Sequence, residues 1–373
     1  MIQIKDIKTP VYVYDGRALE KNISDMLQIV QSYYPKFRIG YSYKTNYFPG
    51  FLRIAKEHGL YAEIVSQDEY WLAKDVGNID SNIIYNGVID DLANKLFVAH
   101  AGGIVNIENM AEMRKFIDYT NDNMVKLEVG IRVNFDVGNG LISRFGIDVD
   151  SKDFEWLANP SNHPYLTFKC VHFHLGGARA PEYFRARVRK TVEIARMLGA
   201  RIVDIGGNIY GRMGDDFKAQ LPFEAPSLED VCTAIGQEMQ SVCPDNDIEL
   251  IAECGSPLVS DAMHLLTTIT NVHSVRGQTF LTCDCRNTDA GWSISKYDPS
   301  REYFGIDKNT VHDAIVCGCE CREKDILIRK YTGPADIGGK LMIRNVGSYS
   351  YSVVNNFISP GCHKCIPIES IIF

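Results

Sequence analysis

The strongest constraint on the fold is a regular alternation of strand-like and helix-like segments along most of the chain. Eight runs enriched in β-branched and aromatic residues lie at 37–43, 61–65, 82–86, 104–107, 126–134, 168–174, 202–206 and 248–253. Helical patterns fill most of the intervals, and residues 182–198, for example, place Val188, Val192 and Ala195 at helix-compatible spacing. Eight such units over about 220 residues predict a (β/α)8 TIM barrel. A doubly wound open sheet is the alternative, and the number of strands favours the barrel.

The pattern changes from Pro257 onward. Short β-prone runs separated by turns replace the long helical patterns, and they lie at 265–272, 279–283, 326–329, 340–346 and 349–354. This texture predicts a β-rich second domain. We therefore expect a barrel domain at 27–255 and a mainly β domain at 256–373, to which residues 1–26 contribute.

Composition and charge exclude several classes of protein. Of the 373 residues, 45% are hydrophobic and 23% are charged, which is ordinary for a globular chain. The net charge of −8 argues against a nucleic-acid or anionic-membrane partner. No apolar run approaches the roughly 20 residues of a membrane-spanning helix, and no secretory signal pattern is visible. Eleven cysteines, an odd number, fit a reducing cytosol better than a disulfide framework, so we expect a cytoplasmic protein.

Chemically active side chains fall at the ends of the predicted barrel strands. Lys44 ends the first strand, and Glu63 lies in the second. Arg132 lies in the fifth strand, His174 ends the sixth and Glu253 ends the eighth. Because TIM barrels keep their chemistry at the C-terminal ends of the strands, these side chains are expected to converge on one face.

Together these residue types meet the needs of pyridoxal phosphate. A lysine amine forms a Schiff base with a carbonyl cofactor, and glycine turns such as Gly206-Gly207 present backbone N–H groups to a phosphate. An imidazole can stack on an aromatic ring, and a carboxylate against a ring nitrogen turns that ring into an electron sink. Each residue alone has a simpler structural explanation. Their joint order along the barrel favours the cofactor site.

Seven short motifs carry a family resemblance, and they are Tyr43-Lys44-Thr45-Asn46, Arg144-Phe145-Gly146-Ile147, His174-Leu175-Gly176-Gly177, Asp204-Ile205-Gly206-Gly207, Glu253-Cys254-Gly255, the segment 318–325 and Gly347-Ser348-Tyr349. In this order the chain resembles the alanine-racemase-fold (fold type III) pyridoxal-phosphate-dependent decarboxylases, which include diaminopimelate and ornithine decarboxylases. Asn355-Asn356-Phe357 follows where the family has a similar segment. The resemblance spans nearly the whole chain.

The resemblance implies a cofactor site made of Lys44, Glu63, Arg132, His174, Gly207, Glu253 and Tyr349. In this set Lys44 would hold the cofactor covalently, His174 would stack on its ring and Glu253 would pair with the ring nitrogen. Gly207 and Tyr349 would contact the phosphate. The other two residues would support the lysine and the ring.

The resemblance also implies a catalytic cysteine. Cys321 would come from the second subunit of a head-to-tail homodimer and would return a proton to the substrate carbon after carbon dioxide leaves. The implied activity is α-decarboxylation of a small-molecule amino acid. Since the two active sites would be shared, the homodimer would be obligatory for activity.

Three positions depart from the family pattern around the phosphate. Ser256 stands where the family usually has an arginine, Gly177 replaces a serine, and Asn208 replaces the third glycine of a Gly-Gly-Gly turn. Phosphate binding is therefore expected to depend more on backbone N–H groups.

The residue after the predicted catalytic cysteine bears on the substrate. In the diamine and diaminopimelate enzymes it is an acid that meets a distal amino group, whereas here it is Arg322. A guanidinium favours a carboxylate or phosphate through charge-assisted hydrogen bonds. We therefore expect Arg322 and Asp325 to bind a substrate with an acidic or conjugated distal group, in a specialised biosynthetic pathway. The alternative is an Arg322 side chain turned to solvent.

Two other functions are alternatives to this prediction, and one cysteine motif raises the question of a metal site. A racemase of the same fold is disfavoured, because such racemases prefer an arginine at the ring nitrogen and use a tyrosine base. A regulatory homologue that has lost catalysis is suggested by the altered phosphate anchors. The segment Cys362-His363-Lys364-Cys365 holds the one proper Cys-x-x-Cys pair, so structural thiols are expected rather than a metal site.

Overall fold

The structure is a computed structural model that describes the chain except residues 355–357 and 359–363. The Asn355-Asn356-Phe357 resemblance and the Cys362-His363 part of the cysteine motif therefore lie outside the described residues.

The eight predicted strands close into a parallel barrel. They are β3 (Phe37–Ser42), β4 (Tyr61–Ile64), β5 (Ile83–Tyr85), β6 (Ile104–Ile107), β7 (Leu127–Asn134), β9 (Leu166–His172), β10 (Ile202–Asp204) and β11 (Glu249–Cys254). Closure comes from the pairing of β11 with β3 and of β6 with β7. The TIM barrel is confirmed, and the open-sheet alternative is wrong. A short strand β8 (Ile147–Asp148) pairs in parallel with the end of β7 and is not part of the closed barrel.

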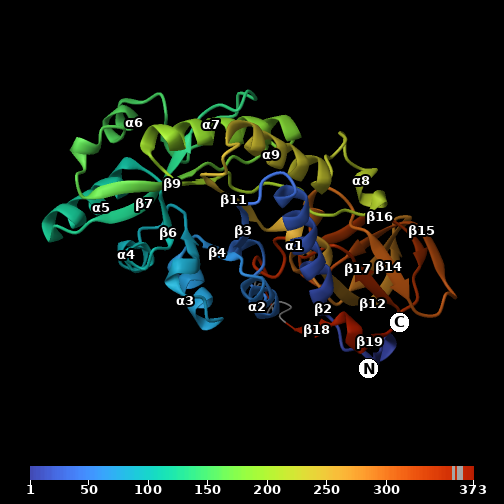
Figure 1. The fold of residues 1–373 in the computed structure, drawn as a ribbon. Helices are drawn as coiled ribbons and strands as arrows, with labels where there is room; N and C mark the ends of the chain where they lie inside the picture. The colour runs from blue at the N-terminus through green and yellow to red at the C-terminus, as the bar shows by residue number, and fades with distance from the viewer. Residues whose placement is uncertain (355–357, 359–363) are drawn as a thin grey trace.

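Helices surround the barrel (Figure 1). They are α1 (Gly16–Gln31), α2 (Pro49–Glu57), α3 (Gln67–Asp75), α4 (Leu92–His100), α5 (Met110–Asn123), α6 (Lys152–Leu157), α7 (Pro181–Leu198), α8 (Asp215–Lys218) and α9 (Leu228–Val242), with the short α10 (Ser256–Val259) and α11 (Asn287–Ala290) farther along the chain. Side-chain caps start several of them: Ser66 accepts from the third residue of α3, and Asn109 does the same for α5. Gly199, with φ 71°, ends α7 in the left-handed conformation that favours glycine. None of the helices in the described part is long and apolar enough to cross a bilayer.

The second domain is mainly β, as predicted. Its strands are β12 (Met263–Val275), β13 (Gln278–Cys283), β14 (Arg301–Phe304), β15 (Thr310–Cys317), β16 (Ile326–Pro334) and β17 (Lys340–Ile343), in the order β14-β17-β12-β13-β15-β16. The predicted strand at 349–354 is wrong. Tyr349 has a left-handed φ of 52°, and its N–H bonds to Thr45 rather than to a neighbouring strand, so the segment turns.

The two ends of the chain meet on this domain. Strand β2 (Val11–Tyr14) pairs with β12 and with β18 (Cys365–Pro367), and β1 (Ile2–Gln3) pairs with β19 (Ile371–Ile372). The N- and C-termini therefore lie close together, with the blue and red ends side by side in Figure 1. The exact domain boundaries remain a prediction.

Candidate active site

Lys44 lies just beyond β3, in a single helical turn (Tyr43–Thr45) at the C-terminal mouth of the barrel. Its Nζ is 2.7 Å and 2.5 Å from the two carboxylate oxygens of the fully buried Glu63 on β4. Burial alone would lower the pKa of Lys44, but the charges of Glu63 and Glu253 outweigh burial and raise it. In this state the lysine is an ammonium held among acids.

A buried asparagine joins the two acids of this cluster. Asn86 follows β5, and its amide N–H₂ donates to Glu63 Oε1 at 3.0 Å and to Glu253 Oε1. The amide of Asn106 donates in turn to Asn86 Oδ1 at 2.9 Å. This bridge keeps two buried carboxylates close together without a direct clash of charge. Sequence reasoning missed Asn86, because an asparagine has no titratable group, although its position at the end of a predicted strand could have identified it.

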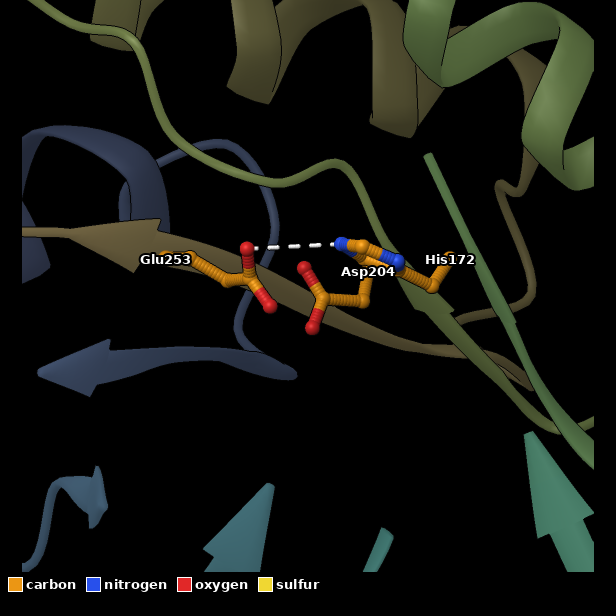
Figure 2. A group of neighbouring side chains, drawn as sticks. All are labelled: His172, Asp204 and Glu253. Atoms are coloured by element: carbon orange, nitrogen blue, oxygen red, sulfur yellow. Dashed lines mark ion pairs between the residues drawn. The ribbon is translucent and has the colours of Figure 1, made fainter. Parts of the chain in front are cut away.

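Glu253 also belongs to a buried triad with His172 and Asp204 (Figure 2). The three side chains come from the ends of β9, β10 and β11, and Glu253 Oε2 lies 3.3 Å from His172 Nε2. Burial would raise the pKa of Glu253, but His172 and Lys44 lower it, so this carboxyl is held as an anion. The donor atoms of the triad lie within 4.8 Å of one another, a spacing that could also suit a cation.

Asp204 behaves in the opposite way. Burial and the neighbouring charge of Glu253 raise its pKa well above the ordinary aspartate range. Its Oδ1 accepts the N–H of Gly206 at 2.9 Å, whereas its Oδ2 has no hydrogen-bond partner among the described residues. The triad therefore sets a neutral carboxyl beside an anionic one.

His174 is oriented by the glycine turn that follows β10. The N–H of Gly207 donates to His174 Nδ1 at 3.0 Å, which places any ring proton on Nε2. Burial lowers the pKa of His174 well below its ordinary value, and Arg132 and Lys44 lower it further, so the ring is neutral. A side chain does not fit at Gly207, where a Cβ would lie 2.2 Å from the carbonyl oxygen of Glu253.

Arg132 on β7 supports this turn from the other side. One terminal nitrogen donates to Glu108 Oε2 at 2.7 Å, and the other donates to the carbonyl of His174 at 3.3 Å. Glu108 also accepts the N–H of Gly146 at 2.9 Å, which ties the Arg144–Ile147 segment to the same acid. Sequence reasoning selected Arg132 and missed Glu108.

Tyr349 reaches the barrel from the β domain. Its N–H donates to the carbonyl of Thr45 at 2.9 Å, and its ring stacks on Trp292 with centroids 5.4 Å apart. Asn46 donates to the carbonyl of Gly347 at 2.7 Å. The structure thus links the predicted Lys44 and Tyr349 segments directly.

Comparison with known protein families identifies the family to which this chain belongs. Residues 20–260 match the family described as "Pyridoxal-dependent decarboxylase, pyridoxal binding domain". The chain belongs to this family. It is therefore an enzyme, an amino-acid decarboxylase of the pyridoxal-dependent class, and the resemblance seen in its motifs is confirmed.

Relatives and solved structures agree with this membership. This decarboxylase is 24% identical over 368 residues to diaminopimelate decarboxylase of Aquifex aeolicus. The aligned region covers 94% of this chain and 84% of that protein. Its fold matches the diaminopimelate decarboxylase of Helicobacter pylori complexed with L-lysine, with a TM-score of 0.82, 21% identity and coverage of 98% and 93%. The arginine decarboxylase of Paramecium bursaria Chlorella virus matches with a TM-score of 0.81, 18% identity and coverage of 97% and 96%.

The predicted cysteine loop of the decarboxylase lies on its β domain. Cys321 and Arg322 are exposed, and Arg322 Nε donates to Glu320 at 2.5 Å. Asp325 is buried instead, and its carboxylate accepts the N–H groups of Asn287 and Glu320, each at 2.7 Å. Asp325 thus shapes the loop that presents Cys321. Its substrate-binding role stays a prediction, as does that of Arg322.

A cavity of about 540 Å³ opens between the loop after β10 and the β domain. Ser256 and Tyr349 border it. Its charged lining residues are all cations, and they are Arg179, Arg212, Lys296 and Arg344. Arg212 pairs with Asp25 and Arg344 with Glu302, but no acid is among the described lining residues. The cavity of this decarboxylase is therefore suited to anions.

Proposed function

We propose that the chain is a pyridoxal-phosphate-dependent α-decarboxylase of an amino acid with an acidic or conjugated distal group, acting in specialised biosynthesis. The observation that carries the proposal is the connected network of Lys44, Glu63, Asn86 and Glu253 at the barrel mouth. It joins the half-buried amine and the two buried acids that the cofactor chemistry needs in one cluster.

The residues present fit the cofactor. Lys44 would hold its aldehyde carbon, and the anionic Glu253 would keep a proton on the ring nitrogen. The neutral His174 would lie against the ring, oriented by Gly207. Gly207 and Tyr349 would contact the phosphate, and the space at Gly207 admits no side chain. When bound, pyridoxal phosphate supplies the electron sink for loss of carbon dioxide.

Lys44 must lose its extra proton before it can act as a nucleophile. Glu63, whose Oε2 is 2.5 Å from Nζ, is placed to receive that proton. Because Asn86 also donates to Glu63, this carboxylate keeps a hydrogen-bond partner when Lys44 no longer bonds to it. Glu63 is thus the positioning and proton-holding residue for Lys44.

A second chain would supply the proton that replaces carbon dioxide. We infer that Cys321 of one subunit reaches the Lys44 site of the other in a homodimer with shared active sites. The exposed position of Cys321, on a loop fixed by the buried Asp325, supports this assignment. Because the buried Asp325 holds the loop, the thiol of Cys321 can face a neighbouring subunit while it stays exposed on its own subunit.

The distal group of the substrate would enter the cationic cavity. Lys296 borders it without an ion pair to any described acid, and aromatic side chains such as Tyr210 and Trp292 line it as well. A carboxylate, phosphate or conjugated ring would be favoured there, whereas a distal ammonium would be repelled. The exposed Arg322 would add a further cation in the assembled site.

The test is carbon dioxide release by purified protein supplied with pyridoxal phosphate. A panel should compare free lysine and ornithine with acidic and conjugated amino acids. We expect release from the second group, together with an absorbance band near the visible edge that borohydride or Lys44→Ala abolishes. Exchange of chirality without carbon dioxide release would instead indicate a racemase. Activity on free lysine or ornithine that Arg322→Asp abolishes would overturn the proposed distal group.

A further inference from the structure

Arg187 is a fully buried cation on α7 that has no acid partner among the described residues. It donates instead to three carbonyls, those of Gly207 at 2.9 Å, Leu175 at 3.1 Å and Ala178 at 2.6 Å. Its Nε has no hydrogen-bond partner in the part of the chain that the structure describes. A charge buried without a counter-ion is costly. Burial and the nearby Arg179 accordingly lower the pKa of Arg187 to about 9.

Arg179 is a second cation beside the same turns. Its Nε donates to Asn208 Oδ1 at 2.6 Å, and its guanidinium lies 4.4 Å from the centre of the Tyr210 ring. It borders the 540 Å³ cavity together with Ser256 and Tyr349. In the described part of the chain no acid pairs with it, so its two terminal nitrogens are available to a ligand.

Asn208 explains how Arg179 is held. It adopts a left-handed φ of 74°, which keeps the turn after Gly207 that a glycine would otherwise make. Its amide nitrogen donates to the carbonyl of Leu175 at 3.1 Å, which leaves its oxygen to accept from Arg179. The same chain lacks an arginine at Ser256 and a serine at Gly177. Two of these departures therefore lie beside Arg179: Asn208 accepts its hydrogen bond, and Ser256 borders the same cavity.

We propose that Arg179 is the phosphate anchor of this decarboxylase, positioned by Asn208 and taking the place of the arginine absent at Ser256. The inference rests on the proposed use of pyridoxal phosphate. A planar guanidinium pairs with a phosphate through two parallel charge-assisted hydrogen bonds. A bound dianion would also offset the repulsion between Arg179 and the buried Arg187. Arg187 acts as a positioning residue, because its three hydrogen bonds hold the carbonyls of both turns.

The test compares two ligands that differ only in the phosphate. Cofactor-stripped wild type, Arg179→Gln and Arg189→Gln are titrated with pyridoxal phosphate and with pyridoxal, and the absorbance change gives each affinity. Arg189 is the matched control, since its exposed side chain also lies on α7 but pairs with Glu238 of α9 and does not border the cavity. We expect Arg179→Gln to bind pyridoxal phosphate about ten- to a hundredfold more weakly. Pyridoxal affinity should be the same in all three proteins.

Two outcomes would overturn the assignment. One is an unchanged affinity of Arg179→Gln for pyridoxal phosphate, and the other is an equal loss for both ligands, which would mean general damage to the turn. If wild type itself binds neither ligand, the proposed cofactor fails rather than the anchor.

Inorganic phosphate provides a second measurement that needs no cofactor. It should raise the Tm of wild type and Arg189→Gln but not that of Arg179→Gln, whose fold is checked by circular dichroism. An equal rise in all three proteins would contradict the proposal. If the glutamine variant does not fold, Arg179→Lys replaces it in the experiment. This variant keeps the positive charge but loses the two parallel N–H donors of the guanidinium, so it should bind pyridoxal phosphate with intermediate affinity.

Discussion

The backbone N–H of Tyr349 donates a 2.9 Å hydrogen bond to the carbonyl of Thr45, the residue that follows Lys44. The hydroxyl of Ser352 donates to the same carbonyl at 3.2 Å, and Asn46 donates to Gly347. The loop that carries the lysine is therefore fastened to the β domain at three points. A substitution that destabilises the β domain should therefore also affect the Lys44 loop at the barrel mouth.

Asn46→Ala tests this coupling. Asn46 is fully buried, donates to the carbonyl of Gly347 and accepts the N–H of Phe48 at 2.9 Å, so its loss leaves buried groups unpaired. We expect a loss of about 1–3 kcal/mol in the free energy of unfolding and weaker binding of pyridoxal phosphate. Urea denaturation and cofactor titration measure the two effects. Asn123→Ala on the surface of α5 is the control and should change neither, and a cofactor affinity unaffected by Asn46→Ala would refute the coupling.

Asn86→Asp tests the bridge between the two acids. The change removes both donated hydrogen bonds and adds a third carboxyl beside Glu63 and Glu253. We expect a loss of about 3–5 kcal/mol at neutral pH, which shrinks in acid as the new carboxyl protonates. Asn86→Ala should lose only about 1–3 kcal/mol. Equal losses for the two variants in denaturant titrations would show that charge plays no part.

Asp204→Asn tests the neutral carboxyl. Burial and Glu253 raise the pKa of Asp204, so the folded protein holds this proton more tightly than the unfolded chain. Its contribution to stability is complete below the unfolded pKa of about 4 and is lost as the pH rises toward the folded value. An asparagine mimics the protonated acid and has no such loss. The stability of Asp204→Asn relative to wild type should therefore increase with pH above about 4.

Denaturation at a series of pH values measures this difference. Asp230→Asn is a control that should stay flat above about pH 4 and change only below it, because hydrogen bonds from Ser227 lower the pKa of Asp230 at the start of α9. A stability difference for Asp204→Asn that stays flat from pH 4 to pH 8 would mean that Asp204 is ionised in the folded protein.

His264 predicts a loss of stability in acid. It is buried, and burial followed by the charge of Arg344 lowers its pKa to about 3. The stability it contributes is present above the unfolded pKa of about 6.5 and is lost as the pH falls toward 3, by at most about 1.4 kcal/mol per pH unit. His264→Gln, which can still accept from the N–H of Asn345, should show a flatter profile. His312→Gln, at an exposed histidine, should follow wild type.

Mixed dimers test the proposed shared site. Lys44→Ala and Cys321→Ala are each expected to be nearly inactive, but under the proposal one intact site would form in every mixed dimer. Equal mixing should restore about a quarter of wild-type activity if subunits exchange at random in a symmetric dimer. Cys319→Ala is the matched control, because Cys319 is exposed two residues before Cys321 and should stay active. Mixtures that remain inactive although mixed dimers form would place Cys321 outside the partner's site.

Much of the fold and part of the site followed from the sequence. The eight barrel strands were placed within about two residues, because each is a short apolar run between helical patterns. Lys44, Glu63 and Glu253 could be grouped because they lie at the carboxyl ends of strands that must meet. The same reasoning did not find Asn86, because its role depends on closure of the barrel, which brings the ends of β5 and β11 together.

Two further features depend on tertiary structure alone. Arg187 lies in a helix whose other charges are mostly exposed, and nothing local distinguishes it; it is buried because carbonyls of two distant turns surround it. The predicted strand at 349–354 has suitable β-prone residues, but a hydrogen bond to Thr45 replaces sheet pairing. In both places long-range contacts override the local pattern.

The pairing of β2 with β12 and β18 sets an order on folding during synthesis. Residues 11–14 are made before the barrel strands, whereas their partners at 263–266 and 365–367 are made after them. The barrel strands can all pair before either partner exists, since they lie between 37 and 254. The N-terminal strand therefore lacks both partners while the barrel strands are being made. Loss of the last residues would leave it with an open edge.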